Sequence, residues 1–319
     1  MSLFPHSLRC KAFHKQSWMP FRGSSSFTAA CLHSTSYSTA AKPQSFLLSS
    51  FPPSTCSWRL RATLHHFQLN FTTQNVDLLK KRENDTEEYR EKWNKMGTVP
   101  VLVVREMGGK ERRISQSMAA MELLNTLMEG SSHQAHQQLI LPSLNDKSLR
   151  SDMVPLLQAL IVEFAEVINS GMQPMQNTKV LRMVKDSFKA QQGSEHSDPK
   201  NLSKELDDRV KREWTEVHLR KGCSKLEHML RDNRGNESFY EEIPREDQDA
   251  LAPFYCIGRR LSIADLCFVP QIYAVATRTS IDLAKEFPMV WQTYEKLQGL
   301  ACFVETDPDH AAKREEYVF

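Results

Sequence analysis

The sequence predicts two folded parts, a small α/β domain followed by a domain built almost entirely of helices. Between about residues 43 and 130, short apolar runs alternate with helix-like patterns. From about residue 145 to residue 319, long stretches repeat apolar residues at the 3.6-residue spacing of an α-helix. A chain of 319 residues, 40% of them hydrophobic, is long enough to give each part a core of its own.

The first part, residues 43–130, reads as a regular alternation of strands and helices. Apolar runs predict strands at 45–51, 69–78 and 99–104, and a fourth around Arg113 and Ile114. Helical spacing predicts helices at 57–67, 89–96 and 115–128. The paired glycines of MGGK, residues 107–110, predict a hairpin turn between the last two strands. The resulting order, strand–helix–strand–helix–strand–strand–helix, is that of a thioredoxin-like α/β layer.

The second part, residues 145–319, follows a linker at 131–144. Helices are expected at 149–172, 211–232, 262–279 and 290–300. The stretch at 262–279 is nearly apolar throughout, which predicts the buried central helix of the domain. Two polar stretches, about 190–210 and 233–252, are rich in charge and poor in large aliphatic residues, so we expect both to be exposed insertions.

Residues 1–42 have the composition of an organellar transit peptide. They carry five basic residues and no acid, the first acid being Asp77, and they are rich in serine. Subtracting their +5 from the net charge of +2 leaves −3 for the remainder. A mitochondrial destination is therefore expected. The alternative is that residues 1–42 are a disordered extension without a targeting signal and that the protein is cytoplasmic.

Composition and spacing also argue against several classes of protein. The longest apolar runs fall far short of the ~20 residues of a membrane-spanning helix. A net charge of +2 is too small to indicate a nucleic-acid partner. The seven cysteines are scattered and include no C-x-x-C, which argues against a disulfide scaffold or a structural zinc site. His65 and His66 are adjacent, and their side chains diverge on a helix, so they do not predict a catalytic metal.

The segment STCSWRLR, residues 54–61, follows the first predicted strand and opens the first helix. Free N–H groups and the positive end of the helix dipole favour an anion at such a position. Cys56 has no second cysteine close by, which disfavours a dithiol oxidoreductase and favours an external thiol bound at this place. The alternative is that Ser54 and Ser57 only cap the helix.

Six segments together resemble the zeta class of glutathione transferases, whose characterised members are maleylacetoacetate isomerases. The resemblance covers about residues 45–310 and is carried by STCSWRLR (54–61), NKMGTVPVL (94–102), QSMAAMELL (116–124), SGMQPMQN (170–177), LSIADLCFVPQIYA (261–274) and FPMVWQTYEKL (287–297). It implies the glutathione transferase fold, in which a thioredoxin-like domain precedes an all-helical one.

The resemblance also implies a glutathione site in the first domain. Pro100 would be cis, so that the Val99 backbone pairs with the cysteinyl part of glutathione. Gln116 and Ser117, at a helix start, would bind its γ-glutamyl carboxylate. The remaining contacts would come from Ser54, Thr55, Cys56, Ser57, Trp58 and Arg59, and from Gln173 and Asn177. The alternatives are an ordinary trans proline and polar residues that only satisfy the backbone at helix ends.

Arg278 closes a nearly uncharged helix and falls where the family has an arginine thought to hold the substrate carboxylate. It could instead pair with Asp282 or with the end of its own helix. Ser262 and Asp265 form a capping box ahead of the apolar run, to which we assign a stabilising role.

The resemblance implies glutathione-dependent conversion of maleylacetoacetate to fumarylacetoacetate, a step of tyrosine and phenylalanine catabolism, by reversible addition of the thiolate to a double bond. Ser54 would hold the sulfur, Arg278 the carboxylate, and Cys56 would tune the site. A homodimer acting on a small acidic substrate, without nucleic acid, membrane or metal, is expected. Alternatives are a zeta-class transferase acting on other small acidic electrophiles and a non-catalytic glutathione-binding protein. Thr55, Lys95 and Thr98 depart from the family pattern.

Overall fold

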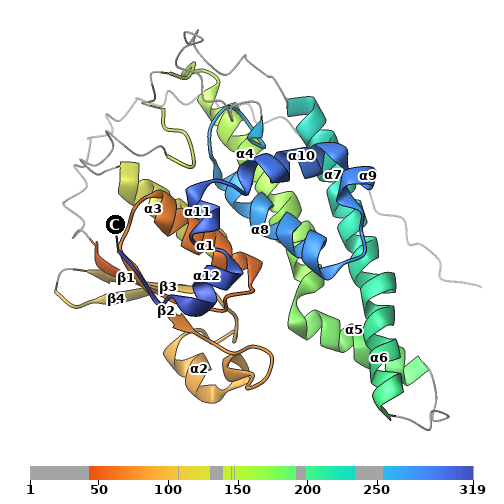
Figure 1. The fold of residues 1–319 in the computed structure, drawn as a ribbon. Helices are drawn as coiled ribbons and strands as arrows, with labels where there is room; N and C mark the ends of the chain where they lie inside the picture. The colour runs from red at the N-terminus through yellow and green to blue at the C-terminus, as the bar shows by residue number, and fades with distance from the viewer. Residues whose placement is uncertain are drawn as a thin grey trace, which may run out of the picture. The chain divides into compact units, whose positions relative to one another are not determined.

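The computed structural model describes residues 43–106, 108–129, 139–144, 146, 148–191, 199–233 and 254–318. The expected transit segment 1–42, most of the expected linker and nearly all of the polar stretch 233–252 lie outside the described residues. From Ala41 onward the chain forms one compact unit, in which the α/β part packs against the helical part (Figure 1).

A five-stranded mixed sheet forms the α/β part, with the strands in the order β4-β3-β1-β2-β5. Its strands are β1 (Pro43–Ser50), β2 (Phe71–Asn75), β3 (Val101–Glu106), β4 (Glu111–Ile114) and β5 (Glu316–Tyr317). β1 runs parallel to β2 and antiparallel to β3, and Ser49 pairs with Val101. The ends of β1 and β2 and the start of β3 therefore share one edge of the sheet.

The four strands expected from the sequence are confirmed, and the burial of their residues accounts for the apolar patterns that predicted them. All four residues of Val101–Val104 are buried, as in a central strand, whereas β2 alternates between buried and exposed residues. The hairpin turn contains Gly108 and Gly109 at φ of +107° and +83°, a conformation that residues with a Cβ rarely adopt. β5 was not expected from the sequence, because two residues are too few to show a pattern.

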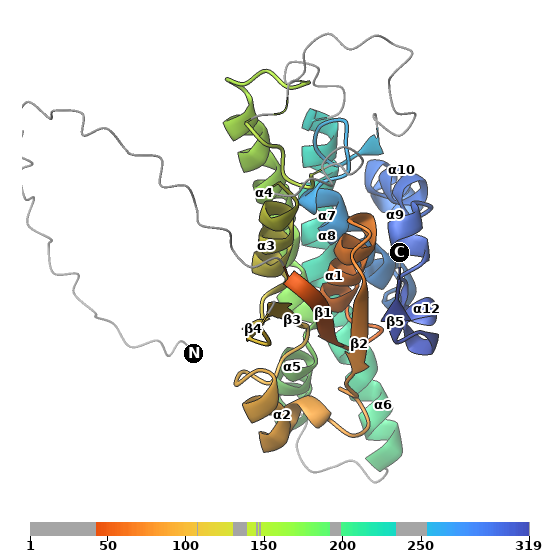
Figure 2. The same ribbon diagram turned by 90° about the vertical axis from the view of Figure 1, so that its left-hand side faces the viewer.

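The end of the described chain returns to the first domain. Tyr317 stacks on Phe71 with ring centroids 4.3 Å apart, and β5 pairs with β2 (Figure 2). The buried guanidinium group of Arg61 donates from Nε to the carbonyl of Thr306 at 3.0 Å. The same group donates to Ser50 Oγ and to the carbonyl of Pro52. The α/β core is thus completed by residues that follow the helical domain.

Helices α1 (Thr55–His66) and α3 (Ser117–Glu129) lie side by side on one face of the sheet, and α2 (Glu87–Lys92) lies on the other side, preceded by the short turn η1 (Glu83–Asp85) (Figure 1). Ser54 is the N-cap of α1, because its Oγ accepts a hydrogen bond from the Ser57 backbone at 3.2 Å. The expectation that this helix begins at Ser57 is therefore wrong by two residues, and Ser57 is buried inside it.

The helical part surrounds one central apolar helix. Its elements are α4 (Val154–Gly171), η3 (Gln173–Gln176), α5 (Thr178–Gln191), α6 (Pro199–Arg209), η4 (Val210–Glu216), α7 (Val217–Asn233), α8 (Ile263–Arg278), α9 (Leu283–Glu286), α10 (Pro288–Leu297), α11 (Ala301–Val304) and α12 (Pro308–Lys313). α8 is buried along nearly its whole length, as the sequence predicts. The stretch Val154–Gln176 is long and apolar enough to span a membrane by composition, and Leu157, Ile161 and Phe164 of it are buried in this core.

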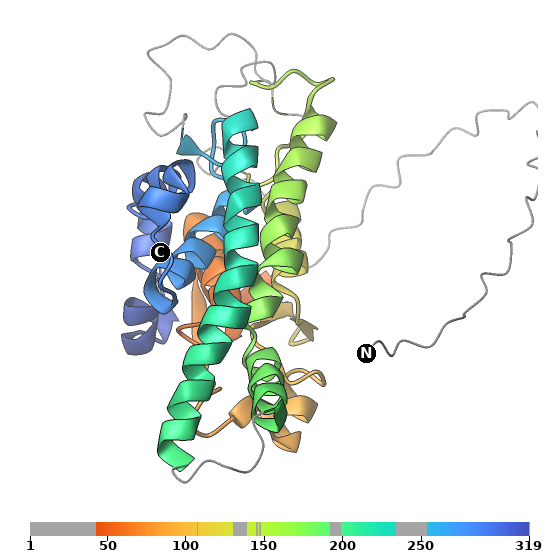
Figure 3. The same cartoon turned by 90° about the vertical axis from the view of Figure 1, so that its right-hand side faces the viewer.

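The polar stretch 190–210 differs from the expectation. From Pro199 it is helical, and α6 continues through the π-helical segment η4 into α7 as one long helix beside α4 and α5 (Figure 3). Leu206 and Val210, four residues apart, bury their side chains, so a sparse apolar stripe suffices for a helix here. Helix α5 was also not expected.

The capping box at the start of α8 is confirmed. Asp265 accepts hydrogen bonds from the backbone N–H of Ser262 at 2.8 Å and from its hydroxyl at 2.9 Å. Its other oxygen accepts from the Cys256 backbone at 2.7 Å. Burial raises the pKa of Asp265 to about 6, despite these hydrogen bonds, which favour the ionised form.

Candidate functional site

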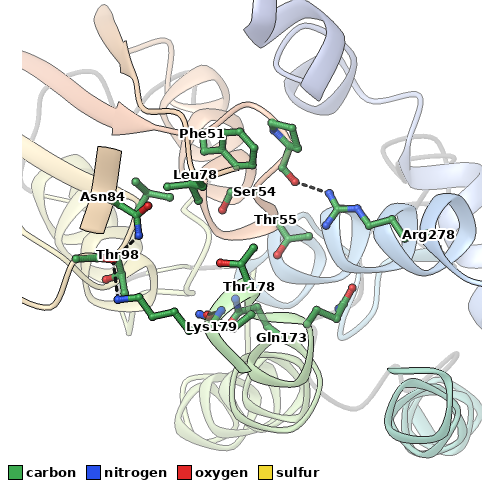
Figure 4. Close-up of a pocket in the computed structure, with 15 residues that line it drawn as sticks. Phe51, Ser54, Thr55, Leu78, Asn84, Thr98, Gln173, Thr178, Lys179 and Arg278 are labelled. Atoms are coloured by element: carbon green, nitrogen blue, oxygen red, sulfur yellow. Dashed lines mark hydrogen bonds between the residues drawn. The ribbon is translucent and has the colours of Figure 1, made fainter. Parts of the chain in front are cut away.

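A pocket opens where the shared edge of the sheet meets the helical part (Figure 4). From the α/β part it is lined by Phe51, Pro53, Ser54, Thr55, Leu78, Asn84, Gly97, Thr98 and Val99. From the helical part it is lined by Gln173, Gln176, Asn177, Thr178, Lys179 and Arg278. Of the residues predicted for the site, the pocket therefore brings together Ser54, Thr55, Val99, Gln173, Asn177 and Arg278.

Ser54 sits on the α/β wall, directly at the N-terminus of α1. Its backbone N–H donates to the Phe51 carbonyl at 2.9 Å, which holds the turn between β1 and the helix. Its hydroxyl oxygen accepts from Ser57 N–H, so the hydroxyl proton can be donated to a ligand. Together with the helix dipole, this arrangement suits an anion such as a thiolate.

The Val99–Pro100 peptide bond is cis, as the resemblance implies, and Val99 lines the pocket. The preceding backbone is fixed by side chains of the α2 region. Tyr89 Oη and Asn94 Nδ2 each donate to the carbonyl of Thr98 at 3.0 Å, and Asn84 Nδ2 donates to the carbonyl of Gly97 at 2.9 Å. This network presents the 97–99 segment rigidly to the pocket.

Arg278 reaches the pocket from the C-terminal end of α8. Its Nη2 donates to the carbonyl of Pro53, next to Ser54 (Figure 4). Partial burial lowers the pKa of Arg278 below the ordinary value, and Tyr273 opposes this shift. The pairing with Asp282 that the sequence left open is not formed, since Asp282 caps α9. A cation thus faces the hydroxyl wall of the pocket.

The helical wall begins where α4 ends. The 3-10 turn η3 places Gln173 and Gln176 on the pocket, and Asn177 caps α5 by accepting from Lys179 N–H at 2.9 Å. Asn177 therefore both lines the pocket and satisfies the backbone.

Charge in the pocket is one-sided. Among the described residues that line it there are two cations, Lys179 and Arg278, and no Asp or Glu. The Nε2 group of Gln176 is a buried donor with no partner in the described part of the chain. Cationic and unsatisfied donor groups fit an acidic ligand.

The other predicted residues lie outside the pocket lining. Ser57, Trp58 and Arg59 are buried in α1, where Trp58 packs edge-on against Tyr273 with centroids 5.2 Å apart. Cys56 is partly exposed but does not line the pocket.

Gln116 and Ser117 lie at the start of α3, beyond Val99 on the β4 side, since Ile114 pairs with Leu102. Gln116 and Ser117 therefore lie at the same end of the strands as Ser54 and Val99. Ser117 Oγ accepts from Nη1 of Arg59 at 3.5 Å.

Arg59 is fully buried, and its Nη1 also donates to Asn169 Oδ1 on α4 at 3.1 Å. Burial works against the charged form of Arg59, but Cys267, Cys56 and Glu166 outweigh it and raise the pKa. Arg59 is therefore a buried charge close to Ser117 and Cys56, and it does not line the described pocket.

Sequence reasoning missed Asn84, Tyr89 and Lys179. Tyr89 is the lone aromatic residue of a polar helix, which is a weak signal of burial. Lys179 stands two residues after Asn177, so its nearness to a predicted site residue was the available signal. Nothing in the sequence marks Asn84. No group of three or more potential metal ligands occurs among the described side chains.

Comparison with known proteins places this geometry in context. Residues 53–127 match the family model of the glutathione S-transferase N-terminal domain. Over 255 residues, 79% of this chain and 86% of the relative, the chain is 29% identical to glutathione S-transferase 1 of Dianthus caryophyllus. It is 26% identical to the maleylacetoacetate isomerase of Mus musculus over 84% of this chain and 94% of the relative.

Solved structures show the same similarity. The structure of maleylacetoacetate isomerase from Anaeromyxobacter dehalogenans 2CP-1 with glutathione bound in the active site superposes with a TM-score of 0.57 at 28% identity. The match covers 83% of this chain and 96% of that one. Another structure of the same enzyme holds dicarboxyethyl glutathione and citrate in its active site. Both the fold and the order of the two domains agree with the expectation from the sequence.

Proposed function

Because this chain is a glutathione transferase-family protein, homologous over most of its length to the zeta class and to maleylacetoacetate isomerases, we propose that it is a glutathione-dependent cis–trans isomerase. Its substrate would be maleylacetoacetate, and its product fumarylacetoacetate, as in the breakdown of tyrosine and phenylalanine.

One observation carries the proposal. A single pocket holds the Ser54 hydroxyl at a helix N-terminus, the Val99 backbone and the guanidinium group of Arg278, with no acidic residue among its described lining residues. These groups fit glutathione, which needs a donor for its thiolate and an extended backbone partner. The unpartnered Nε2 of Gln176 supplies a further donor. The enclosed space is about 100 Å³, so a tripeptide would extend along the open mouth of the pocket.

In this mechanism glutathione supplies a thiolate that adds to the cis double bond and leaves again after rotation about the resulting single bond. Ser54 donates its hydroxyl proton in a hydrogen bond to the sulfur, and the N-terminus of α1 favours the negative charge there. Arg278 holds a substrate carboxylate with its two-pronged guanidinium group. Tyr89 and Asn94 fix the Thr98 carbonyl and thereby the position of Val99.

The test is isomerisation of maleylacetone by the full-length protein, followed by ultraviolet absorbance with and without glutathione. We expect turnover only with glutathione, and a loss of at least about 100-fold in kcat in Ser54→Ala. Ser170→Ala, which alters an exposed serine of α4, is the matched control. Glutathione binding without turnover in the wild type would contradict isomerase activity and favour a binding role.

A second candidate function is glutathione transfer to other small acidic electrophiles. The two cations of the pocket favour transfer as much as isomerisation, because the substrate of either reaction carries a carboxylate that a cation can bind. A dicarboxylic electrophile without a cis double bond discriminates, because only the transferase forms a stable conjugate from it.

We also propose that residues 1–42 direct the protein to mitochondria, because they are basic and free of acids. A fluorescent reporter fused to residues 1–42 tests this, and a diffuse cytoplasmic signal would contradict it. The family resemblance further favours a homodimer, which light scattering would detect as twice the 36.7 kDa chain mass.

A further inference from the structure

Lys179, on α5, reaches across the mouth of the pocket to the backbone before β3. Its Nζ lies 3.3 Å from the carbonyl oxygens of Met96 and of Gly97, and 3.5 Å from Oδ1 of Asp85 (Figure 4 shows it pointing toward the Thr98 segment). All three contacts are long for a charge-assisted hydrogen bond, which is typically 2.7–2.9 Å. The ammonium group is therefore held loosely, on a side chain that is 36% exposed to solvent.

Asp85 does not depend on Lys179 for its charge partner. Arg82 donates to it at 2.8 Å, and Arg182 and Arg90 lie within 3.4 and 3.9 Å. The hydrogen bond from Arg82 is the largest cause that lowers the pKa of Asp85. Four cations thus surround one carboxylate, which leaves positive charge in excess at this rim of the pocket. The neighbouring Glu83 does not balance it, since Glu83 pairs with Lys81.

The sheet order tells which part of a bound tripeptide would meet this rim. Ser117 lies on the β4 side of Val99. Gly97 lies on the other side, because Asn84, in the segment between β2 and α2, donates to its carbonyl. A glutathione whose cysteinyl backbone pairs with Val99 and whose γ-glutamyl end points to Ser117 therefore directs its glycine carboxylate toward Lys179.

We propose, on the basis of the proposed function, that Lys179 is a specificity-determining residue that binds the glycine carboxylate of glutathione. Lys179 exchanges its long contacts to Met96, Gly97 and Asp85 for one short charge-assisted hydrogen bond. Asp85 keeps its arginine partners during this exchange. The helical domain thus contributes two cations with separate tasks, Lys179 for glutathione and Arg278 for the substrate.

Calorimetric binding to the full-length protein tests this assignment without any turnover. The variants are Lys179→Met, Lys179→Arg and the matched control Lys185→Met, whose side chain lies on the same helix and pairs with Asp207 outside the pocket. The ligands are glutathione, its glycine ethyl ester and γ-glutamylcysteine, which lacks the glycine. We expect Lys179→Met to weaken glutathione binding about tenfold, to leave binding of the other two ligands unchanged, and Lys179→Arg to retain affinity. Lys185→Met should behave as the wild type.

The failures can be told apart. If the wild type binds none of the three ligands, the proposed function is wrong. If the wild type binds them and Lys179→Met weakens all three equally, or weakens none, the assignment of the glycine carboxylate to Lys179 is overturned while the proposed function stands.

Discussion

Arg59 of α1 donates from Nη1 to Oδ1 of Asn169 on α4 at 3.1 Å, so a fully buried charge of the α/β domain is held by the helical domain. The same Nη1 points at Ser117, at the start of α3. Nε and Nη2 of Arg59 have no partner among the described residues, so Asn169 is the principal acceptor of this charge.

Removing that acceptor should destabilise the protein. We expect Asn169→Ala to lower the free energy of unfolding by about 2 kcal/mol, because the hydrogen bond to a charged group is lost and the guanidinium group stays buried. Urea denaturation measures the change. Ser170→Ala, at the neighbouring exposed position, should cost less than about 0.5 kcal/mol. Equal costs for both variants would show that the hydrogen bond is not what matters.

Gly222 of α7 is in close contact with the buried Met172. A Cβ at position 222 would lie 2.3 Å from Cγ of Met172, whereas a Cβ at Gly171 would meet nothing within 4 Å. Gly222→Ala should therefore lower the free energy of unfolding by about 1–2 kcal/mol, even though alanine favours a helix.

Thermal or urea unfolding of matched variants checks the prediction for Gly222. Gly171→Ala should be neutral or slightly stabilising. Met172→Ala removes the side chain that a Cβ at position 222 would overlap. Adding Met172→Ala to Gly222→Ala should therefore recover the part of the unfolding free energy that this overlap costs, because the two sites are coupled. Additive effects of these two substitutions would contradict the steric explanation.

Asp265 predicts a specific dependence of stability on pH. Burial raises the pKa of its carboxyl group to about 6 in the folded protein, against an ordinary value of 3.8. The folded chain therefore binds this proton more tightly than the unfolded chain. The associated stability is fully present below pH 3.8 and is lost as the pH rises through about 6.

Asp265→Asn removes this titration, although it also weakens the hydrogen bonds to Ser262. The difference in unfolding free energy between wild type and variant should fall by about 2 kcal/mol between pH 4 and pH 7. Urea denaturation at several pH values measures it. A difference that is constant, or that grows with pH, would refute the raised pKa.

Arg278 should discriminate between acidic and neutral substrates. In Arg278→Met the KM for maleylacetone should rise about tenfold, because a bidentate partner of the carboxylate is lost. The rate with a neutral electrophile such as chlorodinitrobenzene should change less than about twofold. Arg150→Met, at an exposed arginine paired with Asp152, is the control. Equal losses with both substrates would assign Arg278 to glutathione binding or folding instead.

The elements that could be predicted from the sequence are those with a strong local signal. A few neighbouring residues are enough to predict three elements: the strand at Val101–Val104, the turn at Gly108 and Gly109, and the apolar helix α8. β5 and helix α6 could not be predicted in this way. β5 forms only because β2 offers an edge, and α6 forms around the sparse buried pair Leu206 and Val210.

The same distinction holds for the site. Ser54, Val99 and Arg278 lie in recognisable motifs and meet in one pocket. The motif around Ser54 did not reveal that Trp58 and Arg59 face the core, because a helix that contacts a sheet, a ligand and a second domain has no single apolar face. Lys179 enters the pocket two residues after Asn177, on the first turn of α5, a helix that was not expected from the sequence.

The return of the chain to its first domain has a consequence for synthesis. Arg61 donates a hydrogen bond to the carbonyl of Thr306, which is 245 residues later in the chain. Thr73 donates to the carbonyl of Glu315, which is 242 residues later. While the ribosome is still making the helical part, the amino-terminal sheet has an open edge, and a guanidinium group inside it lacks one of its acceptors. The domain that is translated first therefore cannot complete its contacts until the residues up to Glu315 have been made.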